Sequence, residues 1–411
     1  MTVTTASNFD DELVSAGFIA NPYPLFHRLR TEHPVYWSES IGGWILTRYD
    51  DVVVTFKDTA RYSNENRLAK AIDYLPPEKR AHYQAFQDHY STKGLLHSDP
   101  PDHTRMRALI IKEFTPRVVE KMRPRIQQTV DHLVDTAIAK GEMDVVPDLA
   151  EALPVGVIAE ILGVPVADRH LFKKWADDIL GFQGVNKPRE HDLSRAQTGL
   201  VELRQYLKEM INERRQRPRE DLMSRFVAAE ADGQKLSESE LINTSVTFFS
   251  AGYETTLSSI ANTIYTLLAN PDQLRLLREN PTLLPAALEE SLRFECPVSR
   301  QTRLLKTDAE LGGQRLEAGQ MVFQMLNAVN RDPSYFSEPD KFNIQRVDNR
   351  HLAFGLGSHF CVGATLSRVE SLVAVETMLR KLPNLELLDE APDWDLGKRN
   401  SRVLKSLRVS F

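Results

Sequence analysis

One stretch of the chain, FGLGSHFCVG at residues 354–363, places Cys361 among three glycines and a histidine. A thiolate is a strong ligand for iron, and a buried thiolate is costly unless a metal, backbone N–H groups or a helix N-terminus stabilises it. The glycines allow tight turns and leave room for a flat ligand. A helix expected from Val362 to Leu372 directs its N-terminal dipole toward the sulfur. The stretch predicts a metal site at Cys361; the alternative is an ordinary buried cysteine.

A second stretch with chemical potential is AGYETT, residues 251–256, in the middle of a long apolar segment. Glu254 and Thr255 supply an acid and an alcohol that can pass protons to a ligand held nearby. The alternative is that both groups only make local bonds, because a threonine inside a helix often donates to the carbonyl four residues back. Thr247 and Phe248 share a helical face with Ala251, so these three residues are predicted to line a pocket.

Two further motifs carry paired charges. His103 and Arg107 in DPPDHTRMR are four residues apart, hence on one helical face, and both can donate hydrogen bonds to an anion. Glu290 and Arg293 in EESLR are three apart and can form an ion pair. Taken alone, each motif is more typical of a solvated helix face, where such pairs contribute little stability.

The pattern F-G-x-G-x-H-x-C-x-G resembles the haem-binding signature of the cytochrome P450 family. The resemblance implies that Cys361 is the proximal iron ligand and that Phe354, Gly355 and Gly363 belong to the haem-binding loop. An electron-rich thiolate favours cleavage of the O–O bond in haem enzymes.

The remaining motifs resemble the family's others, in the expected order from NPYPLFHRLR to the C-terminus. Glu254 and Thr255 match the oxygen-activation motif and are the implied catalytic residues. The implied contacts of the haem propionates are His103, Arg107, Arg303 and His359. The implied structural supports of the haem loop are Glu290, Arg293 and, from PDKFNIQR, Arg346.

Periodicity supports a mainly α fold with small β-sheets. Helices are predicted at Ala20 to Thr31, Val52 to Phe56, Pro116 to Lys140, Leu149 to Leu162, Ala167 to Leu180, Ala196 to Arg215, Glu238 to Ala269 and Leu283 to Phe294. Gly43 to Tyr49 and Thr302 to Met325 indicate short strands, and 326–353 a long irregular meander. The family resemblance implies one domain over residues 1–411, a triangular helical body with haem between the long central helix and the helix after the cysteine loop.

Composition excludes several classes of protein. A net charge of -6 argues against a nucleic-acid partner, and no window approaches the ~20 apolar residues of a membrane span. The N-terminus has no signal-peptide pattern. Two cysteines, Cys296 and Cys361, make no disulfide framework, so we expect a cytoplasmic protein. We expect a monomer.

The resemblance implies a monooxygenase with haem b as cofactor and O2 as co-substrate. No flavin or nicotinamide fingerprint is present. Electrons from NAD(P)H are therefore expected through separate ferredoxin and ferredoxin reductase partners, with Arg105, Lys112 and Arg368 as candidate ferredoxin contacts. Three alternatives remain open at this stage: a peroxide-driven peroxygenase, a haem gas sensor or carrier, and a protein with a purely structural cysteine.

The expected substrate is a small hydrophobic organic molecule, because such pockets are mostly apolar with a few polar anchors. Variable pocket segments are expected at 64–96, around 165–200, 244–255, 297–301 and 398–404. The predicted pocket residues are Leu95, Thr247, Phe248, Ala251, Val298 and Ser299. A substrate carboxylate bound by Arg300 or Arg399 is a further hypothesis.

Overall fold

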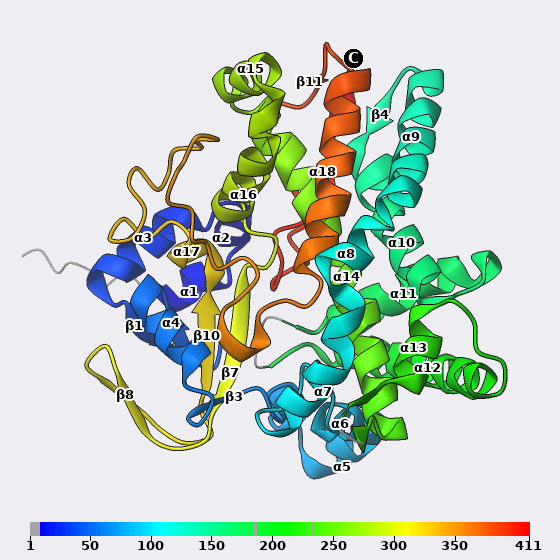
Figure 1. Cartoon of the computed structure of the whole chain (residues 1–411). Helices are drawn as coiled ribbons and strands as arrows, with labels where there is room; N and C mark the ends of the chain where they lie inside the picture. The colour runs from blue at the N-terminus through cyan, green and yellow to red at the C-terminus, as the bar shows by residue number, and fades with distance from the viewer. Residues whose placement is uncertain (1–8, 184–186, 232–233) are drawn as a thin grey trace, which may run out of the picture.

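The computed structural model describes residues 9–183, 187–231 and 234–411, and most of these residues are helical (Figure 1). The helices are α1 (Phe9–Leu13), α2 (Ala16–Ala20), α3 (Tyr23–Glu32), α4 (Tyr49–Lys57), α5 (Pro77–Arg80), α6 (Gln84–Ser91), α7 (Asp102–Ile110), α8 (Pro116–Glu120), α9 (Arg123–Lys140), α10 (Ala152–Leu162), α11 (Arg169–Leu180), α12 (Glu190–Gln216), α13 (Leu222–Ala228), α14 (Glu238–Leu268), α15 (Pro271–Glu279), α16 (Leu284–Phe294), α17 (Leu326–Val329) and α18 (Ala364–Lys381). The mainly α fold class is confirmed.

Helix α14 is the central element. It runs for 31 residues and is buried on most of its faces against α10, α11, α12, α16 and α18. Its start is fixed by a capping box, in which Ser237 and Glu240 each bond to the other's backbone N–H. Most of its serine and threonine hydroxyls donate to the carbonyl four residues back, which satisfies them inside an apolar body.

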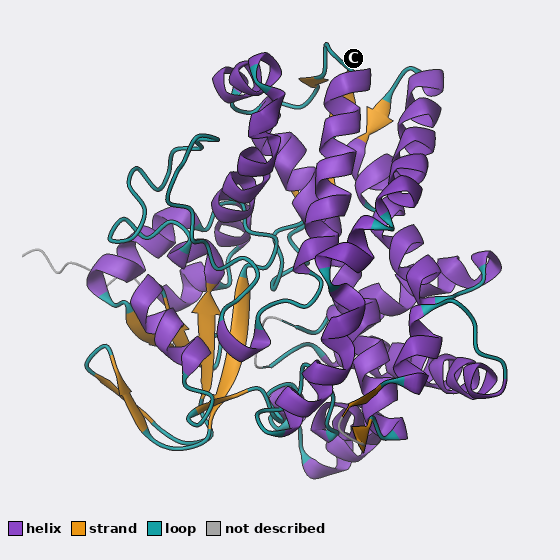
Figure 2. Cartoon of the chain, in the orientation of Figure 1, coloured by secondary structure: helices purple, strands orange, loops and turns teal. Residues whose placement is uncertain are grey.

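A five-stranded sheet stands beside the helices (Figure 2), in the order β1 (Val35–Ser38), β2 (Gly43–Leu46), β10 (Met321–Met325), β7 (Arg300–Leu305) and β3 (Tyr62–Ser63). The β2–β10 pair is parallel and the other pairs are antiparallel. Pairing with β10 along its length fixes the register of β7, the strand that carries Arg300 and Arg303.

The other strands form small ribbons. They are β4 (Met143–Asp144), β11 (Glu386–Leu387) and β14 (Arg408–Ser410) in one sheet, and the pairs β5 (Glu230–Ala231) with β6 (Gln234–Lys235), β8 (Ala309–Leu311) with β9 (Gln314–Leu316), and β12 (Asp393–Trp394) with β13 (Leu404–Ser406). Gly312, Gly313 and Gly319 have positive φ angles, as the turns between the short strands of this region require.

Several predicted helix boundaries were wrong for local reasons. The predicted helix from Pro116 to Lys140 is two helices, because the chain breaks at residues 121–122 and α9 restarts with Pro124 in its first turn. Helix α12 begins at Glu190, six residues before the predicted start. The helix after the cysteine begins at Ala364 and continues to Lys381. Residues 184–186, within the predicted pocket segment around 165–200, lie outside the described residues.

Within the described part of the chain, every helix is too short or too polar to cross a lipid bilayer.

Candidate functional site

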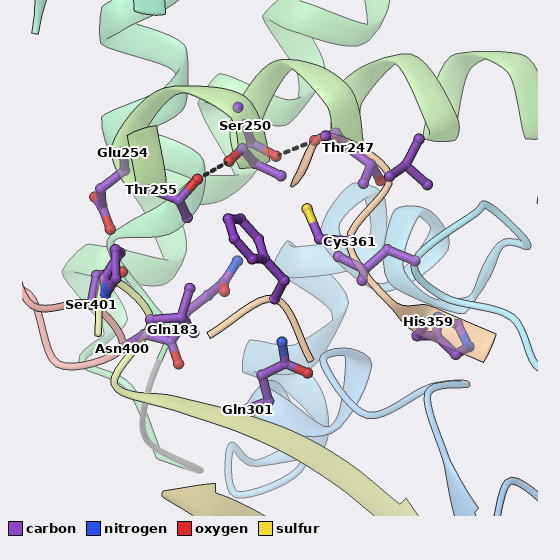
Figure 3. A pocket seen from close by; sticks show the side chains of 18 of the residues that line it. Gln183, Thr247, Ser250, Glu254, Thr255, Gln301, His359, Cys361, Asn400 and Ser401 are labelled. Carbon is purple, nitrogen blue, oxygen red and sulfur yellow. Dashed lines mark hydrogen bonds between the residues drawn. The ribbon is translucent and has the colours of Figure 1, made fainter. Parts of the chain in front are cut away.

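A cavity of about 350 Å³ lies between the central part of α14 and the cysteine loop (Figure 3). Cys361 lies in its wall, and Thr247, Ser250, Glu254 and Thr255 come from α14. Its volume falls in the range of small-molecule sites. The cysteine loop and the AGYETT segment, about a hundred residues apart in sequence, therefore meet at one site.

The cysteine loop is shaped by two left-handed glycines. Gly355 and Gly357 have φ angles of +70° and +75°, a conformation that L side chains rarely adopt. A Cβ atom at Gly357 would lie 3.1 Å from the carbonyl oxygen of Phe56. Cys361 N–H donates to the carbonyl of Phe354 at 2.9 Å, which closes the loop. Gly363 has an ordinary φ angle and lies in the cavity wall beside the sulfur, so it provides space and not a turn.

The Cys361 side chain is surrounded by protein but accessible from the cavity. Burial raises the pKa of the thiol, whereas the N–H groups of Gly363 and Ala364 and the charges of Arg107 and Arg368 lower it. Two backbone donors come from the start of α18, as the expected helix dipole requires. A positive metal ion at the sulfur would lower the pKa of the thiol further and so stabilise the thiolate.

A cluster of cationic and donor side chains lies in the cavity wall on the His359 side. The rings of His103 and His359 lie 3.8 Å apart, and burial, with the neighbouring Arg107, lowers the pKa of His103 to about 4. Burial, with His103 and then Arg303, lowers the pKa of His359 to about 2. Both ring nitrogens of His103 and Nε2 of His359 are buried without a hydrogen-bond partner among the described residues. Each neutral imidazole carries one N–H, so these unpartnered ring nitrogens include donors, which indicates that an acceptor belongs here.

Arg67 is a further member of this cluster that sequence reasoning missed. It lines the cavity, donates to Thr302 Oγ1 at 2.9 Å, and leaves its Nε without a partner. Burial lowers the pKa of Arg67 to about 10, and burial together with Arg67 lowers that of Arg303 to about 9. Asp99 is the one described carboxylate that counters these two shifts. The cationic side chains of this cluster thus outnumber the carboxylates that face them. This excess of positive charge fits the two propionates of a haem.

On α14, the two predicted catalytic side chains differ in their partners. Thr255 Oγ1 donates to the carbonyl of Ala251 at 2.7 Å, which is the local bond that the sequence analysis gave as the alternative to proton transfer. Glu254 is buried and forms an ion pair with Lys398, with 2.5 Å between Oε2 and Nζ. Lys398 also contacts Asp177 of α11 at 3.3 Å. Burial alone would lower the pKa of Lys398, but Glu254 and Asp177 outweigh it and raise the pKa, so the lysine is charged.

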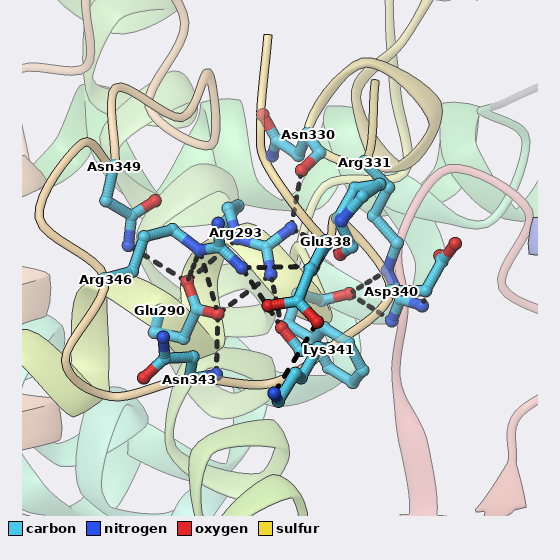
Figure 4. A network of polar contacts seen from close by, with 12 residues as sticks. Glu290, Arg293, Asn330, Arg331, Glu338, Asp340, Lys341, Asn343, Arg346 and Asn349 are labelled. Carbon is cyan, nitrogen blue, oxygen red and sulfur yellow. Dashed lines mark hydrogen bonds and ion pairs between the residues drawn. The ribbon is translucent and has the colours of Figure 1, made fainter. Parts of the chain in front are cut away.

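The predicted structural trio is a buried network (Figure 4). Arg293 donates to both oxygens of Glu290 at 2.8 Å, and Arg346 Nε lies 3.1 Å and 3.2 Å from them. The two guanidinium groups use their remaining donors on backbone carbonyls of the meander, those of Ser337, Glu338, Pro339, Lys341 and Asn330. The network therefore anchors the irregular chain that leads into the cysteine loop.

The comparisons with known proteins agree with this geometry. The family model described as Cytochrome P450 matches residues 68–405. The chain belongs to the cytochrome P450 family. Members of this family are haem monooxygenases, so the chain is an oxidoreductase of that class.

Two curated relatives of this cytochrome P450 come from bacteria. The biotin biosynthesis cytochrome P450 of Bacillus subtilis is 37% identical over 400 residues, 97% of this chain and 98% of that protein. The cytochrome P450 monooxygenase PikC of Streptomyces venezuelae is 39% identical over 419 residues, 99% and 96% of the two chains. Among solved structures, P450BioI in complex with hexadec-9Z-enoic acid ligated acyl carrier protein has a TM-score of 0.88 at 35% identity, covering 96% of this chain and 99% of that one.

Within this P450 fold, most of the predicted pocket residues lie where expected. Leu95, Thr247, Phe248, Ala251 and Val298 line the cavity, together with other apolar side chains (Phe114, Ile158, Leu180, Phe182). Ser299 does not: its hydroxyl accepts from Asn327 at 3.2 Å and it lines a small separate cavity. Its backbone contacts explain this correction, because Ser299 N–H donates to the carbonyl of Asn400 at 2.9 Å and its carbonyl accepts from Asn327 N–H at 3.4 Å.

Two of the three candidate ferredoxin contacts have partners within the chain. Arg105 forms an ion pair with Glu240 of α14. Arg368 makes two bonds to Glu289, at 2.6 and 2.8 Å, and stacks over the ring of Phe354 at 4.3 Å. Arg368 thus links Glu289 of α16 to Phe354 at the start of the cysteine loop. Lys112 is exposed and pairs with no carboxylate among the described residues, so it alone has the free charge that the prediction required.

The cavity also has a polar side, built by residues of three expected pocket segments, around 165–200, 297–301 and 398–404. Gln183, Gln301, Asn400 and Ser401 face the interior, on the side away from His359 (Figure 3). The amides of Gln301 and Asn400 make no hydrogen bond to other described residues. Alternation along β7 could have indicated Gln301, two residues before Arg303; nothing in the sequence pairs it with Asn400.

Proposed function

We propose that this cytochrome P450 inserts one atom of O2 into a small, mainly apolar organic substrate, with electrons delivered from NAD(P)H by separate ferredoxin and reductase partners. The observation that carries the proposal is the meeting of Cys361, Thr255 and Glu254 at one cavity. Haem bound at Cys361 supplies the redox chemistry and the activation of oxygen. The chain supplies the ligand, the proton donors and the shape of the substrate site.

The haem is held, in this proposal, by side chains on two sides of the cavity. Cys361 would bind its iron, in the loop formed by Phe354, Gly355 and Gly363. Its propionates are bound by His103, Arg107, Arg303 and His359, with Arg67 as an added donor. Bonding of these carboxylates to the unsatisfied ring nitrogens and guanidinium groups removes the cost of leaving buried donors unpaired.

Thr255 and Glu254 have different tasks in the proposed reaction. The Thr255 hydroxyl lies in the cavity wall, where its oxygen can hold a water by accepting a hydrogen bond while its proton is donated to the carbonyl of Ala251. Glu254 lies one residue earlier and forms an ion pair with Lys398, which in turn contacts Asp177. Glu254 therefore connects the cavity with these two charged groups. Proton transfer through Glu254 requires that this carboxylate exchange its bond to Lys398 for one toward the cavity.

The experiment that tests the proposal compares two sources of oxidising equivalents. We expect substrate oxidation with NADPH and a surrogate ferredoxin and reductase pair to exceed oxidation with hydrogen peroxide by at least ~10-fold, because the acid and alcohol pair suits proton delivery to bound O2. Lys112→Glu should weaken the ferredoxin-dependent rate and leave the peroxide-dependent rate unchanged. Equal rates from both sources would favour a peroxygenase, and no turnover with either source would favour a gas sensor or carrier.

A further inference from the structure

Arg300, which lines the cavity, differs from most of the buried arginines. Six arginines of the described residues are buried. Four of them pair with carboxylates, namely Arg214 with Asp221, Arg293 with Glu290, and both Arg331 and Arg402 with Glu295. The other two, Arg300 and Arg303, pair with none of the described carboxylates. Both are on β7 and both line the cavity.

A buried guanidinium without a counter-charge is unfavourable, which is why buried charges are nearly always paired. Arg303 lies in the cluster assigned above to the haem propionates, so its missing counter-charge is accounted for. Arg300 lies outside that cluster. Its pKa is lowered to about 10 by burial and then by Arg399, with no contribution from Arg67 or Arg303.

The local contacts of Arg300 leave one nitrogen of the guanidinium, Nη1, without a partner among the described residues. Nε and Nη2 both donate to the carbonyl of Arg399, at 2.9 and 2.5 Å, which fixes the side chain against the 399–402 segment. Nη1 is buried and has no hydrogen-bond partner among the described residues. The side chain is thus held in place with one donor nitrogen unused.

The neighbours of Arg300 do not supply the missing anion. Glu254 and Asp177, the carboxylates on this side of the cavity, are both bonded to Lys398. Arg399 adds a second positive charge; it is exposed and lines only the small separate cavity, whereas Arg300 lines both cavities. The free amides of Gln301 and Asn400 lie in the same part of the wall and can donate further hydrogen bonds.

We propose that Arg300 is a specificity-determining residue that binds the carboxylate of the substrate, so that the preferred substrates are apolar molecules ending in a free acid. This inference rests on the proposed function and deepens it. Arg300 holds the acid end with Gln301 and Asn400, while the apolar wall of Leu95, Phe248 and Val298 surrounds the remainder. A guanidinium suits a carboxylate because a hydrogen bond between two charged groups is stronger than one between neutral groups, and Nη1 has the free N–H groups for it.

The test is binding of matched ligands to the holoenzyme. A series of straight-chain C8 to C16 acids is compared with the methyl ester and the N-acetylcysteamine thioester of each acid, by equilibrium dialysis and by the Soret shift. We expect the best acid to bind roughly 10- to 100-fold more tightly than its ester or thioester, the range expected for hydrogen bonds to a charged group. Arg300→Met should abolish this preference, Arg300→Lys should retain part of it, and Arg399→Met should leave it unchanged.

Each other outcome contradicts the inference. Equal binding of acids, esters and thioesters by the unmodified protein would show that no anion site exists, and tighter thioester binding would favour a carrier-tethered substrate. Loss of haem from Arg300→Met, with the acid preference intact, would assign Arg300 to a propionate. Dialysis reports the acid preference whatever the haem spectrum is, so the inference and the proposed function can fail separately.

Discussion

Replacing Glu290 with glutamine is expected to lower the free energy of unfolding by about 3–5 kcal/mol, the cost of breaking a buried ion pair by removing one partner. Glu290 accepts from Arg293, Arg346, the backbone N–H of Asn343 and the amide of Asn349. A glutamine keeps the shape but leaves two guanidinium groups, both nearly inaccessible, without a counter-charge. The measurement is urea unfolding of the holoenzyme, followed by far-ultraviolet circular dichroism.

The neighbouring Glu289 provides the matched control. It pairs with Arg368 and His351 at a half-exposed position, and its pKa falls to about 2 because these bonds outweigh the effect of burial. Glu289→Gln should therefore cost distinctly less than Glu290→Gln. If Glu290→Gln does not fold, Glu290→Asp and limited proteolysis of residues 330–353 still report on the network. An equal and small loss from both glutamine variants would contradict the anchoring role of Glu290.

Replacing Glu254 with glutamine is expected to reduce product formation by roughly 100-fold or more, in line with the usual contribution of a positioned acid. The glutamine can keep a hydrogen bond to Lys398 but cannot transfer a proton. Thr255→Ala should lower the ratio of product to NADPH consumed, because the hydroxyl at the cavity wall is lost. Both effects are measured as product and NADPH in the same reaction, with a solvent isotope effect on product formation.

Asp177→Asn is the matched control for the acid. It removes the other carboxylate bonded to Lys398 and leaves Glu254 in place. We expect this variant to keep most of the coupling between NADPH use and product. If Glu254→Gln and Asp177→Asn reduce product formation equally, the carboxylates only hold the C-terminal loop, and Glu254 has no role in proton transfer.

The parts of this molecule that are local in sequence could be predicted. The cysteine loop, the central helix and the Glu290–Arg293 pair each depend on residues within a few positions of one another, so spacing indicated these features, while the family resemblance supplied the role of the ion pair. The family resemblance then joined them into one fold, which the comparisons confirm. The single-domain organisation and the individual roles of the site residues remain predictions.

The parts that depend on distant pairing could not be predicted. Lys398 meets Glu254 across 144 positions, and Arg67 meets Thr302 across 235. No periodicity marks such contacts, because they follow from how the C-terminal loop and the segment before α5 pack against the body. Ser299 was misplaced for a related reason. Its position depends on the pairing of the preceding residue, Val298, with Ser401, which lies far away in the sequence.

The central claim is that Cys361 ligates a haem iron as thiolate, and the most direct test is the absorption spectrum of the dithionite-reduced protein under CO, recorded beside Cys361→Ser. We predict a strongly red-shifted Soret band for the unmodified protein and its loss in the serine variant, since only a thiolate ligand produces that shift. Cys296→Ser, which changes the buried second cysteine, should keep the band. A colourless protein, or a CO band typical of histidine ligation, would contradict the claim and the roles assigned around it.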